Sequence, residues 1–137
     1  MDEQAKIDQQ ATGLAIGHIV SGVLLGGVGL LFLGHVGVGV AAIAGMIPDP
    51  ALGSPLGGGL FGAMFLGMGL LALAIFEGYA VLSFYAAACF LRRKHRTFLI
   101  VVQILNLFHQ PLGTVLGVLG LVWLMQAPVA RAFEDAR

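Results

Sequence analysis

Polar side chains that could do chemistry lie inside apolar segments of this sequence. Counted along helices from the basic residues 92–96, Glu77 and His109 lie at similar depths, about 20 Å from that end. Gln103, Asn106 and Gln110 recur three and four residues apart, so a helix would place them on one face. Because ionisable residues at membrane depth are costly and usually functional, the sequence predicts a polar intramembrane cluster of Glu77, Gln103, Asn106, His109 and Gln110.

The cluster has two interpretations. In the first, it is a hydrogen-bonded structural network, in which Glu77 is protonated or paired with His109 and satisfies backbone groups released at Pro111. In the second, Glu77 titrates along a proton or ion pathway lined by the polar face of residues 103–110. A third possibility places Glu77 against another subunit.

The histidines offer one further site. Haem between membrane helices needs two axial histidines at one depth, and His35 and His109 are the only plausible pair. His18 falls near the inner end of the first apolar segment, and His95 belongs to a basic turn. One cysteine and scattered acids give no metal constellation. We expect no resident cofactor and no metal, and the absence of a paired nucleophile and base argues against an enzyme.

Composition identifies the elements that must hold these residues. Of 137 residues, 58% are hydrophobic and 10% charged, and the mean hydropathy is +0.96. No Lys or Arg occurs between Lys6 and Arg92, and no charge occurs between Arg96 and Arg131. Such a chain cannot cover the surface of a soluble fold. The composition therefore excludes a soluble enzyme, a nucleic-acid-binding protein and a disordered chain, and predicts a polytopic membrane protein.

The apolar segments predict an all-α integral membrane protein, a single-domain bundle of four transmembrane helices with a short C-terminal hairpin. We expect one long helix over 12–47, which the prolines at 48 and 50 end, and a second over 60–91. The segment 97–125 is interrupted at 109–111 and gives the hairpin; one kinked helix is the alternative, with three spans. The remaining ranges are a polar N-terminal segment (1–11), an extracytoplasmic loop (48–59), a basic cytoplasmic loop (92–96) and a C-terminal tail (127–137).

Positive charge predicts the orientation. Basic residues favour the cytoplasmic side, so both termini should be cytoplasmic, in the plasma (inner) membrane. The four basic residues that we expect to set topology and contact anionic lipid are Arg92, Arg93, Lys94 and Arg96.

Glycine spacing indicates how the helices associate. The chain has 21 glycines, and small residues spaced by four let a neighbouring helix approach closely. The expected packing positions are Gly13, Gly17, Gly22, Gly26, Gly113 and Gly117. The leading functional hypothesis is an interaction or structural subunit that packs through these faces into a homo-oligomer or larger membrane complex, among membrane lipids and without nucleic acid. A conducting oligomer using Glu77 is the alternative, and a haem protein using His35 and His109 is the second alternative.

The last third of the chain resembles a known group. The sequence Leu91-Arg92-Arg93, an apolar helix, the segment Pro-Leu-Gly-Thr-Val-Leu-Gly at 111–117 and the Trp-containing run 121–125 resemble small bacterial polytopic membrane proteins. Those proteins share a basic turn followed by a Pro-Leu-Gly-Thr-x-Leu-Gly helix, and the resemblance spans residues 60–133. It implies a membrane fold and no particular chemistry. This chain departs from the pattern in having His109-Gln110 before the proline.

Overall fold

The computed structural model describes residues 2–47, 55–108 and 111–135, and within these ranges every regular element is a helix. Two stretches are long and apolar enough to cross a membrane: Glu3–Ile43, and Gly58–Arg92 within α3. A third is possible if α5 and α6, bent by 78° at their junction, form one span. The all-helical prediction with candidate spans is confirmed. The helices are α1 (Glu3–Leu31), α2 (Leu33–Ile43), α3 (Pro55–Arg92), α4 (Arg96–Leu107), α5 (Pro111–Leu124) and α6 (Ala127–Asp135).

The first helix begins at Glu3, so most of the segment predicted as polar N-terminus is helical. Its inner face carries Ile7, Ala11 and Leu14 at helical spacing, and all three are buried. The expected long helix is interrupted at Phe32, which separates α1 from α2. After α2, Gly45 adopts a positive φ of 69°, and the amides of Gly45 and Met46 bond to the carbonyls of Ala42 and Ala41. This is a Schellman cap, and it ends the helix before the prolines.

The helix α3 begins at Pro55, so the loop predicted to reach residue 59 ends earlier. Proline suits the first position of a helix because its missing N–H has no intrahelical partner there. At its other end α3 includes Arg92, and Arg93 and His95 take left-handed backbone angles (φ 50° and 56°). The predicted basic loop is therefore a turn of residues 93–95.

The described chain divides into two compact units by its internal contacts, and the assignment to a single domain stays a prediction. The first unit contains residues 1–23 and 80–137, and the second contains Leu24–Tyr79, so α1 and α3 each contribute to both. The first unit has an apolar core around Phe90, Leu99, Trp123 and Leu124. In the second unit, Phe32 stacks on Phe76 and His35 stacks on Phe65.

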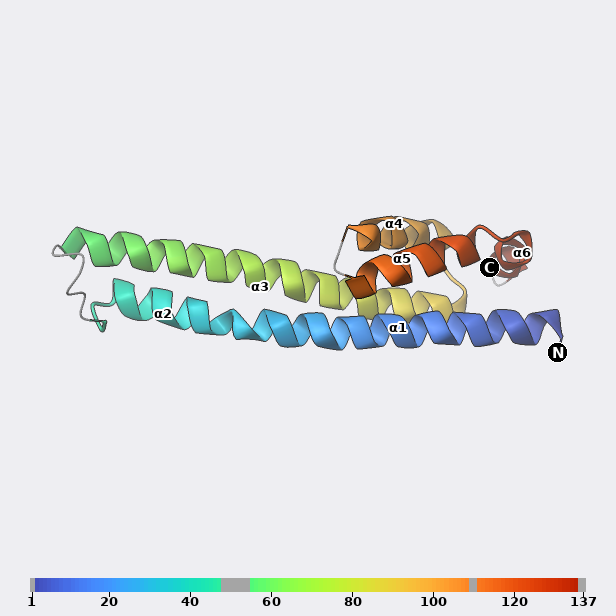
Figure 1. Cartoon of the computed structure of the whole chain (residues 1–137), viewed down its shortest axis with the longest axis horizontal. Helices are drawn as coiled ribbons and strands as arrows, with labels where there is room; N and C mark the ends of the chain where they lie inside the picture. The colour runs from blue at the N-terminus through green and yellow to red at the C-terminus, as the bar shows by residue number, and fades with distance from the viewer. Residues whose placement is uncertain (1, 48–54, 109–110, 136–137) are drawn as a thin grey trace. The chain divides into compact units, whose positions relative to one another are not determined.

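Within the first unit, α4 and α5 are two helices packed side by side (Figure 1), as the hairpin prediction requires. The turn residues His109 and Gln110 lie outside the described ranges. In the segment predicted as the C-terminal tail, residues 127–135 form the helix α6. Val129 and Phe133, one turn apart, are buried in the core, while Arg131 is exposed. This amphipathic pattern buries one face of a segment that is polar on average.

Candidate functional site

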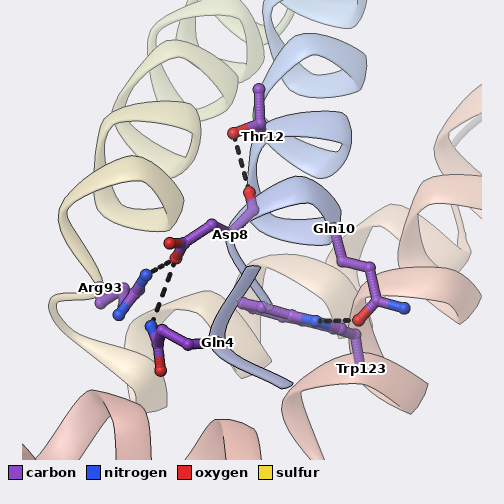
Figure 2. A network of polar contacts seen from close by, with 6 residues as sticks. All are labelled: Gln4, Asp8, Gln10, Thr12, Arg93 and Trp123. Carbon is purple, nitrogen blue, oxygen red and sulfur yellow. Dashed lines mark hydrogen bonds and ion pairs between the residues drawn. The ribbon is translucent and has the colours of Figure 1, made fainter. Parts of the chain in front are cut away.

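The first unit joins the N-terminal helix to the basic turn through an ion pair. Arg93 pairs with the carboxylate of Asp8 (Figure 2). With its side-chain amide oriented to suit its neighbours, Gln4 accepts hydrogen bonds from the Arg93 guanidinium, at 2.6 Å from Nη1 and 2.9 Å from Nη2. Thr12 donates its hydroxyl to the Asp8 carbonyl at 2.8 Å and so belongs to the same helix turn. Arg93 thus joins α1 to the turn that follows α3. A basic residue that only sets the membrane topology would not need this contact.

Two further hydrogen bonds join helices in this unit. The Trp123 indole donates to Gln10 Oε1 at 3.0 Å, which links α5 to α1 (Figure 2). The Arg96 guanidinium donates twice to the Leu124 carbonyl, at 3.1 Å from Nε and 2.7 Å from Nη2. Leu124 is the last residue of α5, so Arg96 satisfies a carbonyl that has no intrahelical partner. Arg96, assigned from the sequence to topology and lipid contact, therefore also binds protein.

The most deeply buried polar pair is His18 with Gln103. Both side chains are 0% exposed, and the Gln103 amide donates to His18 Nε2 at 2.9 Å. The imidazole also stacks on Phe90, with ring centroids 5.4 Å apart. His18 Nδ1 and Gln103 Oε1 have no hydrogen-bond partner among the described residues. Ser83 and Asn106 are two further polar residues that are buried in this unit.

The sequence analysis did not pair His18 with Gln103. His18 lies ten residues along α1 from the Asp8 carboxylate, and Gln103 lies seven residues along α4 from Arg96. Both residues therefore lie within a few helical turns of the polar end that the sequence assigned to the cytoplasm. The sequence did not indicate which face of α1 lies against α4, and the pairing depends on that face.

The predicted cluster members are distributed over both units. Gln103 and Asn106 are buried in the first unit, whereas Glu77 belongs to the second. The Glu77 Oε1 atom lies 2.6 Å from the position that a Cβ would take at Gly29. That oxygen is buried and has no hydrogen-bond partner among the described residues. His109 and Gln110 lie outside those residues, so the five-residue cluster stays a prediction.

The haem hypothesis also depends on a residue outside the described ranges. His35 lies in the second unit between Phe32 and Phe65, with ring centroids 5.2 and 5.5 Å away. Its proposed partner His109 is not described, so the pair stays a prediction. In the described part of the chain, no three His, Cys, Asp or Glu side chains gather as metal ligands.

Several predicted packing glycines contact helices of the same chain. A Cβ at Gly117 would lie 2.7 Å from the Gln103 carbonyl, and one at Gly22 would lie 3.0 Å from the Phe84 ring. Gly17 faces Leu116 in the same way. Gly113 is buried and Gly26 half-buried. The sequence left open whether the partner helix is internal, and for Gly17, Gly22 and Gly117 it is.

A second group of glycines has open space instead. Nothing lies within 4 Å of a Cβ built at any of these exposed positions, Gly13 among them. The group comprises Gly13, Gly27, Gly34, Gly37, Gly59, Gly67 and Gly78. The chain itself therefore does not explain why these positions are small.

The exposed basic residues complete the predicted set. Arg92 and Lys94 are exposed, while Arg93 and Arg96 are partly buried by the contacts given above.

No family model, curated protein or solved structure matches this chain. The resemblance noted at residues 111–117 therefore stays a prediction.

Proposed function

We propose that this protein is an integral membrane interaction subunit, and not an enzyme, that assembles into a homo-oligomer or a larger membrane complex through a small-residue face of α3. The supporting observation is a row of exposed small residues at helical spacing: Ala63, Gly67, Ala74 and Gly78. With 100° per residue they fall within about 60° of one another around the helix. Such a row lets a neighbouring helix approach closely, and intramembrane association depends on that packing.

The exposure of the candidate spans supports the same proposal. In Gly58–Arg92, only 11% of an apolar stretch of 18 residues is buried within the chain. In Glu3–Ile43, the corresponding share is 28%. Lipid covers part of such a surface, but lipid does not require small residues in register. Because a Cβ built at Gly67 or Gly78 would meet nothing within 4 Å in the described part of the chain, the proposal assigns these positions to a second copy of the chain or another membrane subunit.

The proposed topology places the N-terminus, the basic turn and α6 on the cytoplasmic side. Asp8 contacts Arg93, and Ile7 shares a core with Val129 and Phe133, so the three segments belong to one end of the first unit. The basic turn then assigns that end to the cytoplasm of the plasma membrane. The helices α4 and α5, with 12 and 14 residues, are shorter than a ~30 Å hydrocarbon core requires. They would complete the four-helix bundle as a hairpin that enters and returns on the same side.

The assembly proposal is tested by adding bulk to the open face. Gly67→Leu and Gly78→Leu should lower the native mass of the protein in mild detergent, or remove a co-purifying partner, without changing its helicity. Met68→Phe is the matched control, since Met68 is exposed and lies about 100° round the helix from Gly67. If both glycine variants keep the wild-type mass and partners, the face is not used for assembly.

A conducting oligomer is the second candidate function, and the Glu77 carboxyl favours it. One oxygen of this residue is buried against Gly29 without a hydrogen bond from the described residues, although ionisable groups in apolar helices are costly. Purified protein in liposomes tests this candidate at mildly acid and neutral pH. Glu77→Gln should abolish proton or cation flux, and Glu3→Gln, which alters an exposed carboxylate, should not. No flux above empty liposomes removes the candidate, and equal flux in wild type and Glu77→Gln excludes Glu77 from the path.

A further inference from the structure

A polar cavity opens beside the basic turn of the first unit. Its volume is about 510 Å³, and its lining comes from residues 93–97 on one side and from α6 on the other. Lys94, His95, Arg96 and Thr97 contribute from the turn and the start of α4, and Phe133 and Glu134 contribute from α6. Arg93, Lys94 and Arg96 therefore contribute cationic side chains to the lining of a space large enough for a headgroup-sized ligand.

The charges at this cavity are incompletely neutralised. The charge of Arg93 is paired with Asp8. Arg96 donates two hydrogen bonds to the Leu124 carbonyl, which is neutral and leaves the charge of Arg96 uncompensated. Lys94 is exposed, and its side-chain ammonium has no hydrogen-bond or ion-pair partner among the described residues. Glu134 is the one acid among the described lining residues, so its single negative charge is outnumbered by the positive charges of Lys94 and Arg96. An anion would find a net positive environment with one guanidinium already held in place.

The cavity lies at the start of helix α4. The helix α4 begins at Arg96, and its N-cap residue His95 makes no side-chain capping bond. Amides in the first turn of a helix lack intrahelical acceptors and carry the positive end of the helix dipole. Thr97, in that first turn, adds a hydroxyl to the lining. Cationic side chains and a hydroxyl at the start of a helix are donors that suit a phosphate group.

We infer that this cavity binds a phosphate group, carried by an anionic phospholipid headgroup or by a soluble phosphate. Its place at the ends of apolar helices suits a headgroup, because α3 ends at Arg92 and the apolar stretch of α4 begins at Phe98. The amphipathic helix α6 forms the opposite wall, and such helices lie at the boundary between headgroups and acyl chains. The inference concerns a ligand site and does not depend on the proposed assembly face.

Native mass spectrometry in nonionic detergent tests the inference with defined probes. Phosphatidylglycerol should be retained in preference to phosphatidylcholine, and Lys94→Gln should weaken its retention about fivefold, as expected for one lost cation. Lys6→Gln is the matched control, because Lys6 is exposed, lies outside the lining and removes the same charge. Inorganic phosphate is titrated in a parallel arm, and circular dichroism checks that each variant remains folded.

Each outcome decides the inference. Selective phosphatidylglycerol retention that falls in Lys94→Gln alone supports a lipid headgroup site. Binding of inorganic phosphate with the same variant dependence, but no lipid retention, supports a soluble phosphate. Equal losses in Lys94→Gln and Lys6→Gln, equal retention of the two lipids without phosphate binding, or no binding of any probe would overturn it.

Discussion

The His18 imidazole on α1 and the Gln103 amide on α4 form a hydrogen bond of 2.9 Å between two fully buried side chains, 85 residues apart in the chain. A buried polar group whose partner is removed loses its hydrogen bond without regaining water. The pair therefore specifies how α1 and α4 meet, since sliding either helix would leave both groups unsatisfied.

Removing one partner should cost more than removing both. Gln103→Leu keeps the approximate volume but leaves His18 Nε2 without its donor, and should destabilise the fold by roughly 1–3 kcal/mol. His18→Leu with Gln103→Leu should cost less than the sum of the single changes. Unfolding in mixed micelles with increasing sodium dodecyl sulfate, followed by circular dichroism, measures all three variants. Additive effects would show that the two side chains are not coupled.

Two neighbouring glycines of α2 should respond oppositely to alanine. A Cβ at Gly39 would lie 2.5 Å from the Leu66 backbone nitrogen, which cannot move without displacing α3, so Gly39→Ala should destabilise by about 1–3 kcal/mol. Gly37 has open space, so Gly37→Ala should be neutral or stabilise by up to about 1 kcal/mol through helix propensity. Hydrogen exchange of α2 and α3 reports the difference. Equal exchange in the two variants would contradict the close approach at Gly39.

The single tryptophan gives a direct test of the contact between α1 and α5. Gln10→Ala removes the acceptor of the Trp123 indole, and should shift the emission spectrum and cost about 1 kcal/mol. Gln9→Ala changes the neighbouring exposed glutamine and serves as the control. An emission spectrum that is identical in wild type and Gln10→Ala would argue against this hydrogen bond.

Cysteine labelling tests the proposed topology. In a Cys89→Ser background, cysteine at positions 2 and 135 should react only after the membrane is opened, while cysteine at position 52 should react from outside. The background protein without added cysteine controls for non-specific labelling. Position 135 reacting from outside would exclude the arrangement with both ends in the cytoplasm.

Patterns of apolar residues were sufficient to predict an all-helical chain with two long apolar stretches. They were insufficient where polar residues form amphipathic helices. Residues 3–10 and 127–135 are polar on average, yet Ile7 and Phe133 point into the same core, and recognising this requires the partner face. Average hydropathy therefore did not reveal that both terminal segments form helices with one face in the core.

The candidate site was predicted in part for a similar reason. Gln103 and Asn106 were identified as one polar helix face, and both are buried in the first unit. Their partner His18 could not be found from a single helix, because the contact depends on how α1 is placed beside α4. The glycines show the same limit, since spacing alone predicts that Gly17 and Gly117 pack but not which helix they meet.

The bond from Arg96 to the Leu124 carbonyl has a consequence for synthesis of the chain. The acceptor is made 28 residues after the donor, so the start of α4 cannot complete its contacts until the whole of α5 has left the ribosome. The two helices therefore mature together, and a nascent chain that stalls before Leu124 exposes an unsatisfied guanidinium beside an apolar helix. Truncation within α5 should consequently expose α4 to quality-control proteases, even though every residue of α4 is present.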